Sequence, residues 1–245
     1  MVVIVPMAGR GSRLSPLFGN KPKPLIEVAG KPIFHWALKS VEKCTFTRIL
    51  FICLKEHERK CGISGIIKSH VDSEFEISFL DHVTGGQLCT VMEICEKIKK
   101  DEDILIISSD TYVVSDISND IKNISNDCRG LISVADMPGD RWSFAKTDKS
   151  GNVRQVAEKI RISDHASTGM YYFSSGREFV EYGNEILVEK KTTSGEYYVI
   201  QAYEKYLEDG KIIGISKADK MWDMGNIDSL NLFKEYLSSE GNRNG

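Results

Sequence analysis

Short apolar runs rich in β-branched residues alternate along the chain with segments of helical periodicity. In the first half, we expect strands at residues 2–5, 48–54, 75–80 and 104–108. A segment that opens at Pro32 has a helical apolar stripe, formed by Ile33, Phe34, Ala37, Leu38 and Val41. The alternation predicts an α/β fold with a mostly parallel, doubly wound, Rossmann-like sheet flanked by helices.

The pattern changes after Gly130, where short strands follow one another with turns between them. The expected elements are strands at 131–135, 143–147, 153–157 and 169–173, a hairpin turn at 148–152, a helix at 194–208, a strand at 212–216 and a helix at 227–237. We expect one domain over residues 1–237, with a small additional β-rich portion, and a disordered tail over 238–245.

Charge and cysteine content exclude several classes of protein. With 32 Lys and Arg against 35 Asp and Glu, the net charge of −3 gives no general attraction for nucleic acid or for an anionic membrane. The 6 cysteines show neither a CxxC pair nor a zinc-ligand spacing, so reduced thiols are expected. No apolar run approaches the ~18 residues of a membrane span. We therefore expect a cytoplasmic protein that binds neither nucleic acid nor membranes.

A glycine-rich loop, MAGRGSR over residues 7–13, follows the first predicted strand. Backbone N–H groups of such a loop can cradle phosphate oxygens, and glycines permit their close approach. Leu14 replaces the third glycine of the dinucleotide fingerprint, which disfavours a nicotinamide cofactor. An ordinary glycine turn with a solvated arginine is the alternative interpretation.

Two lysines, Lys21 and Lys23, lie in the sequence KPKPL over residues 21–25. The prolines restrict the backbone and would hold a lysine against a polyanion. A proline-rich surface loop explains this segment equally well.

The glycine-rich loop and the lysine segment belong to a set of short motifs that resembles a family signature. PMAGRGSR at residues 6–13, KPL at 23–25 and GKP at 30–32 resemble the signature of the sugar-phosphate nucleotidyltransferase family, the nucleoside-diphosphate-sugar pyrophosphorylases, most closely members that serve capsule and surface-polysaccharide synthesis. The resemblance implies that the loop binds a nucleoside triphosphate through Met7, Ala8, Gly9, Gly11 and Ser12. It also implies that Arg13 stabilises the departing pyrophosphate and that Lys23 touches the phosphate under attack, with Lys21 as the competing candidate.

Residues 84–90, TGGQLCT, resemble the glycine turn with which the family reads the nucleotide base. The resemblance assigns Thr84 and Gly86 to nucleotide binding. Many relatives carry Gly-Thr-Ala or Gly-Ala-Ala where this chain has Gly86-Gln87-Leu88, so the base stays open. A helix N-terminus capped by Thr84 is the alternative.

Asp110 follows the strand predicted at 104–108 and therefore lies at the carboxyl edge of the sheet, where ligands of open α/β folds bind. A lone aspartate after a strand is more often a helix or turn cap. In the family, an aspartate here holds magnesium together with a second one far downstream, and Asp223 in WDMG at 222–225 matches the second. The resemblance thus implies Mg²⁺ held by Asp110 and Asp223.

The acceptor site is expected in the half at about 131–225, and the nucleotide site in the half at about 1–130. Glu158 and Lys159 match a family pair that contacts the sugar and its phosphate, and Gly169 and Glu196 match further acceptor segments. The alternative for Glu158 and Lys159 is a surface ion pair.

Together these features predict transfer of an NMP group from a nucleoside triphosphate to a phosphorylated small molecule, first of all a sugar 1-phosphate, with release of pyrophosphate. The acceptor phosphate is ionised near neutral pH, so no general base is required. The alternatives are a cytidylyltransferase for a non-sugar phosphate such as phosphocholine, a nucleotide-sugar-dependent glycosyltransferase, and a regulatory homologue without turnover. The glycosyltransferase signature Asp-x-Asp is missing around Asp110, and a homo-oligomer stays open.

Overall fold

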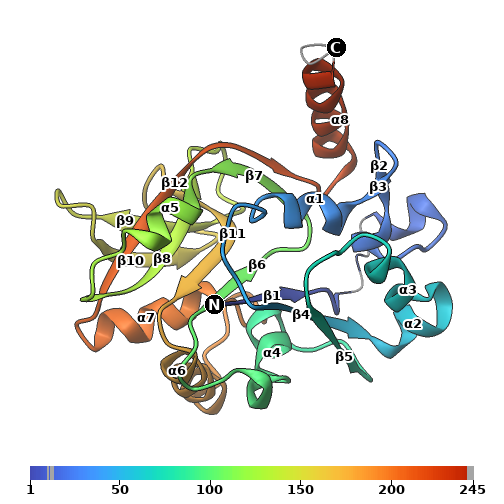
Figure 1. Cartoon of the computed structure of the whole chain (residues 1–245). Helices are drawn as coiled ribbons and strands as arrows, with labels where there is room; N and C mark the ends of the chain where they lie inside the picture. Colours follow the sequence, from blue (N-terminus) through green and yellow to red (C-terminus); the bar gives the residue numbers. More distant parts are fainter. Residues whose placement is uncertain (10, 12–13, 242–245) are drawn as a thin grey trace.

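A computed structural model describes residues 1–9, 11 and 14–241 (Figure 1). Its main sheet follows the order β5-β4-β1-β6-β11-β8-β12-β7, and β9 and β10 pair beside β11. The strands of this sheet are β1 (Val2–Pro6), β4 (Arg48–Leu54), β5 (Phe75–Leu80), β6 (Ile104–Ile107), β7 (Thr111–Ser115), β8 (Cys128–Ala135), β9 (Ser143–Thr147), β10 (Val153–Glu158), β11 (Ala166–Phe173) and β12 (Ile212–Asp223).

The other elements are two short strands and a set of helices. The α-helices are α1 (Ile33–Lys39), α2 (Lys55–Cys61), α3 (Ile63–Lys68), α4 (Gln87–Met92), α5 (Ile117–Lys122), α6 (Gly176–Glu189), α7 (Ile200–Glu208) and α8 (Ile227–Gly241). Single 3₁₀ turns are η1 (Ser15–Phe18), η2 (Lys23–Leu25) and η3 (Cys95–Lys97), and the short strands β2 (Glu27–Val28) and β3 (Lys31–Pro32) pair with each other.

The predicted fold class is confirmed, because β5, β4, β1 and β6 run parallel and helices cover both faces of the sheet. Side chains of β1 alternate between two cores: Val2 and Ile4 face the first, while Val3 and Val5 face the second. Residues of α4, α6 and α7 complete the first core, and residues of α1 and α3 complete the second. In Figure 1, α4, α6 and α7 lie below the sheet and α1 above it.

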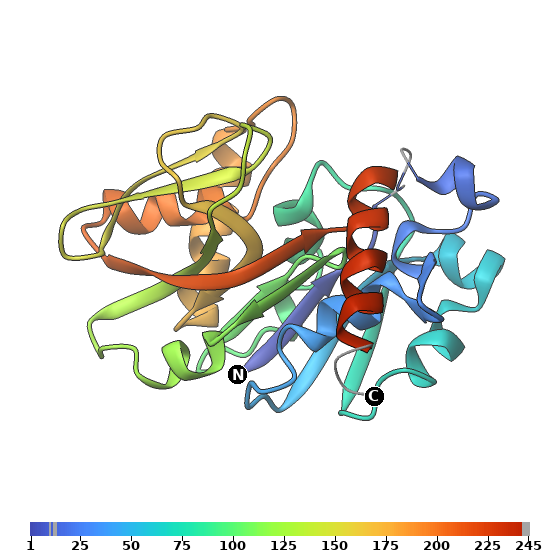
Figure 2. The same cartoon turned by 90° about the horizontal axis from the view of Figure 1, so that it is seen from above.

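The second half mixes strand directions. β11 is antiparallel to β6 and β8, whereas β12 is parallel to β8 and antiparallel to β7. Figure 2 shows β12 as a long red-orange strand that crosses the molecule and leads into α8. No helix in the described part of the chain is both long and apolar enough to cross a lipid bilayer.

Three sequence predictions need correction. β12 continues to Asp223 rather than ending at Ser216, because its polar second half pairs with β7, a strand that the sequence pattern did not reveal. The predicted helix at 194–208 begins only at Ile200, since the backbone of Tyr197 bonds instead to Gly85 and Leu88. α8 runs on to Gly241, so the expected disorder does not begin at Ser238.

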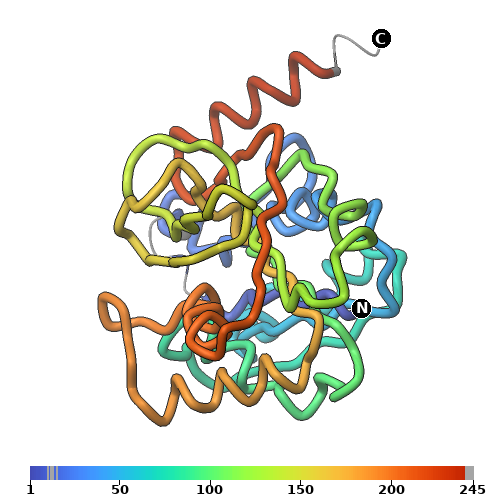
Figure 3. The backbone as a smooth tube through the Cα atoms, turned by 90° about the vertical axis from the view of Figure 1, so that its left-hand side faces the viewer, coloured from blue at the N-terminus to red at the C-terminus, as the bar shows by residue number. Residues whose placement is uncertain are grey.

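The C-terminal helix is held by a third, separate apolar cluster. Met224, Leu230 and Phe233 are buried there, and the rings of Trp222 and Tyr236 stack at 3.9 Å. Figures 1 and 3 show α8 projecting from the body of the molecule. The cluster therefore fixes the end of β12 against the strands that precede it.

Candidate active site

A cavity of about 690 Å³ opens at the carboxyl ends of β1 and β6, between the two halves of the chain. Among the described residues, most of the sequence-predicted site residues line it: Ala8, Gly9, Gly11, Lys23, Thr84, Gly86, Asp110, Glu158, Lys159, Gly169, Glu196 and Asp223. Met7 does not, because its side chain is buried in the second core. Ser12 and Arg13 lie outside the described residues. The structure thus gathers segments from both halves of the chain around one space.

The glycine-rich loop lies directly against Lys23. Gly11 has φ +61°, and a β-carbon placed on it would lie 2.6 Å from Cβ of Lys23. Only a residue without a side chain fits this approach without strain. The loop and Lys23 are therefore positioned as one unit.

Lys23 begins the single turn η2, and the buried residues Pro24 and Leu25 anchor this turn. Its ammonium forms an ion pair with Asp110 inside the cavity, where the two side chains are 20% and 26% exposed. Lys21 instead pairs with the exposed Glu27 at 2.8 Å and does not line the cavity. This placement supports Lys23 over Lys21 as the lysine that meets a substrate.

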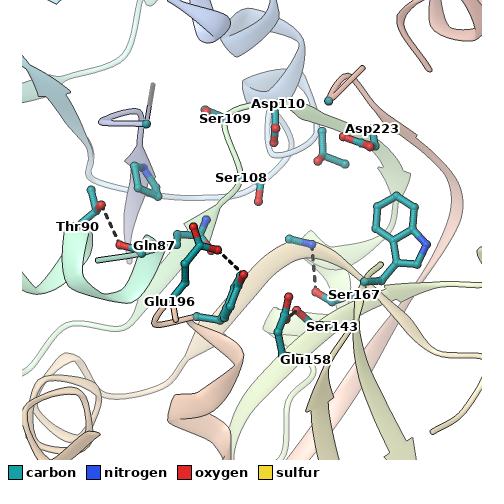
Figure 4. A pocket seen from close by; sticks show the side chains of 18 of the residues that line it. Gln87, Thr90, Ser108, Ser109, Asp110, Ser143, Glu158, Ser167, Glu196 and Asp223 are labelled. Atoms are coloured by element: carbon teal, nitrogen blue, oxygen red, sulfur yellow. Dashed lines mark hydrogen bonds between the residues drawn. The ribbon is translucent and has the colours of Figure 1, made fainter. Parts of the chain in front are cut away.

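Strand pairing brings Asp110 and Asp223 together. Asp223 at the end of β12 lies opposite Thr111 at the start of β7, and the Met224 amide donates a hydrogen bond of 2.8 Å to the Asp110 carbonyl. Figure 4 shows both carboxylates at the same edge of the cavity, with Glu158 and Ser143 at the other. Two aspartates that are distant in sequence thus face one space.

The two carboxylates differ in charge environment. Burial opposes ionisation of Asp110, but the ammonium of Lys23 outweighs it, and the pKa of Asp110 is lowered. Burial and then the charge of Asp110 raise the pKa of Asp223, against the opposing effects of Lys23 and of Arg141, whose guanidinium lies 2.9 Å from the Asp223 carboxylate. Each aspartate therefore already faces a positive charge.

This donor set fits magnesium. Mg²⁺ is usually held by one or two carboxylates together with substrate phosphates, rather than by a full protein cage. No group of three or more His, Cys, Asp or Glu side chains gathers as a metal cluster within the described ranges. Asp110 and Asp223, each paired with a cation, match the sparse type of site.

The turn before α4 forms the wall of the cavity opposite Asp110 and Asp223 (Figure 4). Gly86 has φ +142°, and a β-carbon on it would lie 2.3 Å from the Tyr197 carbonyl oxygen. The helix begins after Gly86 without a side-chain cap, and the Thr84 hydroxyl donates to the Gly86 carbonyl instead. The interpretation of Thr84 as a helix cap is therefore wrong, because its hydroxyl is turned toward a carbonyl rather than toward a free N–H group.

The residues predicted to bind the acceptor lie on and beside the β9–β10 pair. Glu158 lies opposite Ser143 in the strand register, its buried carboxylate accepts a hydrogen bond from the Ser143 hydroxyl, and burial raises its pKa. Lys159 follows with its ammonium on the Tyr198 hydroxyl, and that hydroxyl donates to Glu196. The surface ion pair proposed as the alternative for Glu158 and Lys159 is not formed, since each contacts another partner.

Comparisons with known proteins agree with this geometry. The family described as Nucleotidyl transferase matches residues 2–239. The chain belongs to this family. The sugar nucleotidyltransferase resemblance noted in the sequence is thereby confirmed.

Individual relatives are distant but cover most of the chain. The bifunctional protein GlmU of Methanocaldococcus jannaschii is 26% identical over 229 residues, which are 91% of this chain and 50% of that protein. The UTP–glucose-1-phosphate uridylyltransferase AglF of Haloferax volcanii is 23% identical over 229 residues, 89% of this chain and 88% of that one. The chain spans about half the length of several of the curated relatives that it matches.

Solved structures share the fold. A nucleoside-diphosphate-sugar pyrophosphorylase from Vibrio cholerae has a TM-score of 0.80 and 26% identity, covering 95% of this chain and 99% of that one. The mixed, mostly parallel sheet is therefore a property of this nucleotidyltransferase family and not only of this sequence.

Several residues that line the cavity were not among the site residues predicted from the sequence. Gln87, Ser108, Arg141, Trp142 and Tyr198 all line the cavity. Arg141 and Trp142 precede β9 in a polar loop, and no short motif marks them. Only the pairing of β9 with β10 brings this segment beside Glu158.

Proposed function

We propose that the protein is a magnesium-dependent nucleotidyltransferase that joins an NMP group from a nucleoside triphosphate to a sugar 1-phosphate and releases pyrophosphate. The observation that carries this proposal is the convergence of Lys23, Asp110 and Asp223 in one cavity with the acceptor-side pair Glu158 and Lys159. The pyrophosphorylase-like relatives support the reaction class.

In the proposed reaction, an oxygen of the acceptor phosphate attacks the α-phosphorus, and the bond from that phosphorus to the bridging oxygen of the leaving pyrophosphate breaks. No proton has to be removed from the nucleophile, so the site needs positive charge rather than a base. Lys23 stabilises the equatorial oxygens of the reacting phosphate. Arg13, which lies outside the described residues, is assigned to the pyrophosphate.

Asp110 and Asp223 would hold Mg²⁺ at the edge of the cavity. The ion would neutralise charge on the triphosphate and so allow two polyanions to approach each other. The backbone bond between Met224 and Asp110 keeps the two carboxylates in register for this role.

The acceptor side favours a hydroxylated, phosphorylated molecule. The Glu158 carboxylate is positioned to accept a hydrogen bond from a sugar hydroxyl, and Lys159 offers a cation to a phosphate. A phosphocholine acceptor is disfavoured because two aromatic faces that could hold its ammonium already carry protein cations: Arg141 lies 4.1 Å over Trp142, and Lys159 lies 4.7 Å over Tyr198. A nucleotide-sugar-dependent glycosyltransferase would neither use a triphosphate nor release pyrophosphate.

Supply of nucleotide sugars for polysaccharide synthesis is the proposed biological purpose. A relative from Haloferax volcanii, 24% identical over 218 residues, is named low-salt glycan biosynthesis nucleotidyltransferase Agl11. The name of this relative supports a role in glycan assembly.

The experiment is a matrix of nucleoside triphosphates against sugar 1-phosphates, alditol phosphates and phosphocholine, with pyrophosphate release as the readout. Acceptor-dependent pyrophosphate formation that chelator abolishes is the expected result. If the protein turned over only phosphocholine with CTP, phosphocholine would replace a sugar 1-phosphate as the acceptor. If it turned over only a finished nucleotide sugar, the proposed reaction would be overturned.

A further inference from the structure

Two basic side chains occupy the two carboxylates assigned to magnesium. Lys23 pairs with Asp110, and Arg141 pairs with Asp223 at 2.9 Å. The Asp223 side chain is only 13% exposed, so its contact with Arg141 is well shielded, whereas Arg141 itself is 45% exposed. Arg141 reaches this position from the loop between β8 and β9, which belongs to the acceptor half.

The charges of this cluster balance. Asp110 and Asp223 carry two negative charges, and Lys23 and Arg141 carry two positive charges. If the two carboxylates ligate a divalent cation instead, the balance is kept and both side chains are released. Two cations are then available in the cavity at the moment when phosphates enter it.

Arg141 is well placed for such an exchange. Its guanidinium lies over the Trp142 ring, and the Trp142 indole N–H is bonded to the Pro138 carbonyl at 3.0 Å. Arg161 donates to the carbonyls of Met137 and Gly139, at 2.7 and 3.0 Å. The loop is thus tied down on both sides of Arg141, and rotation of one side chain would suffice to leave Asp223.

The chemistry of the guanidinium points to its second partner. Its planar fork matches two oxygens of a carboxylate or of a phosphate equally well. Arg141 lines the same cavity as Lys159 and Glu158, and it lies two residues before Ser143, which pairs with Glu158 in the strand register. While the guanidinium of Arg141 is paired with Asp223, its fork is not available to a phosphate in the cavity.

We propose that Arg141 is the resident counter-ion of Asp223 in the metal-free protein and binds the acceptor phosphate once Asp223 ligates magnesium. This proposal rests on the proposed function and adds a residue to its acceptor site. By thermodynamic linkage, magnesium and the acceptor phosphate then strengthen each other's binding, because the first relieves Arg141 of its competing partner.

The test compares wild type with Arg141→Gln in two binding titrations that contain no nucleotide. In the first, Mn²⁺ replaces Mg²⁺ and the free ion is measured by electron paramagnetic resonance. Because the competing cation is gone, Arg141→Gln should bind Mn²⁺ about 2- to 5-fold more tightly than wild type. In the second, inorganic phosphate is titrated into Mg²⁺-saturated protein by calorimetry, and Arg141→Gln should bind it about 5-fold or more weakly.

Two further variants make the comparison specific. Arg177→Gln removes an exposed arginine that pairs with Asp101 at 3.5 Å away from the cavity, and it should change neither titration. Arg141→Lys keeps the charge but not the fork, so its Mn²⁺ affinity should stay within about 2-fold of wild type while its phosphate affinity falls. If the near-ultraviolet circular dichroism of Arg141→Gln shows a loss of fold, the titrations are evaluated with Arg141→Lys instead.

The outcomes are separable. Unchanged or weaker Mn²⁺ binding by Arg141→Gln overturns the counter-ion role, and unchanged phosphate affinity overturns the acceptor role. Neither titration depends on turnover, so failure of this proposal would leave the nucleotidyl-transfer reaction standing, whereas failure of the reaction would be seen in the pyrophosphate assay.

Discussion

Gly11 and Lys23 lie so close that a β-carbon on Gly11 would be 2.6 Å from Cβ of Lys23. Gly11→Ala should therefore push Lys23 away from the reacting phosphate as well as strain a backbone with φ +61°. We expect kcat/KM to fall by about 10-fold or more. Gly19→Ala is the matched control, because Gly19 has φ +68° but no atom within 4 Å of the added carbon. Equal losses of activity in both variants would assign the effect to backbone strain and contradict the coupling to Lys23.

Alanine variants of the two lysines in the proline-flanked segment, Lys21 and Lys23, should differ in turnover. Lys23→Ala should lower turnover by on the order of 10²-fold, since a preorganised cation near the developing charge is lost. Lys21→Ala removes an exposed pair with Glu27 outside the cavity and should change turnover by less than about 3-fold. Steady-state rates of both folded variants provide the measurement, and the reverse order would move the catalytic role to Lys21.

Neutralising either aspartate at the proposed metal site should weaken magnesium. Asp110→Asn and Asp223→Asn should each raise the Mg²⁺ concentration for half-maximal rate by about 10-fold or more, because a neutral amide is a poorer ligand for this ion. Asp219→Asn, on an exposed position of β12, serves as the control. A substrate-bound structure with the two carboxylates more than about 8 Å apart would exclude a shared ion.

Acceptor binding should depend on pH through Glu158. Burial raises the pKa of this carboxyl, so its ionised, hydrogen-bond-accepting form is lost at a higher pH than for an ordinary glutamate with a pKa of about 4.3. As the pH falls, KM for the acceptor should therefore begin to rise at a higher pH in the wild-type protein than it would if this carboxylate were exposed. Glu158→Gln keeps a hydrogen-bonding carbonyl but cannot ionise. The acceptor phosphate titrates in the assays of both proteins, so comparing their pH profiles cancels its contribution. Identical pH profiles for both proteins would remove Glu158 from acceptor recognition.

The sequence pattern located strands whose own residues are continuously or alternately apolar. It missed strands that depend on pairing with a segment distant in the sequence. β4 and β5 were located at their true bounds, because β4 is an apolar run after Arg48 and β5 alternates Phe75, Ile77 and Phe79 with the polar residues Glu76 and Ser78. β7 and the second half of β12 were missed, because the apolar run of β7 spans only residues 112–114, the second half of β12 is largely polar, and the two segments pair with each other.

The candidate site follows the same division. Lys23 and Asp110 could be found from short motifs beside predicted strands, and the structure brings them into contact. Arg141 and Ser143 could not, since their relation to Asp223 and Glu158 depends on the register of strands that pair across turns and loops. Sequence spacing does not contain that register.

The pairing of β7 with β12 also sets the order in which the site comes into existence. A ribosome synthesises the glycine-rich loop, Lys23 and Asp110 before it reaches Asp223, which lies more than a hundred residues after Asp110. Until β12 has been made and has docked, Asp110 has no second carboxylate beside it. A nascent chain that has not yet been extended to β12 therefore lacks one of the two carboxylates to which the proposed reaction assigns magnesium.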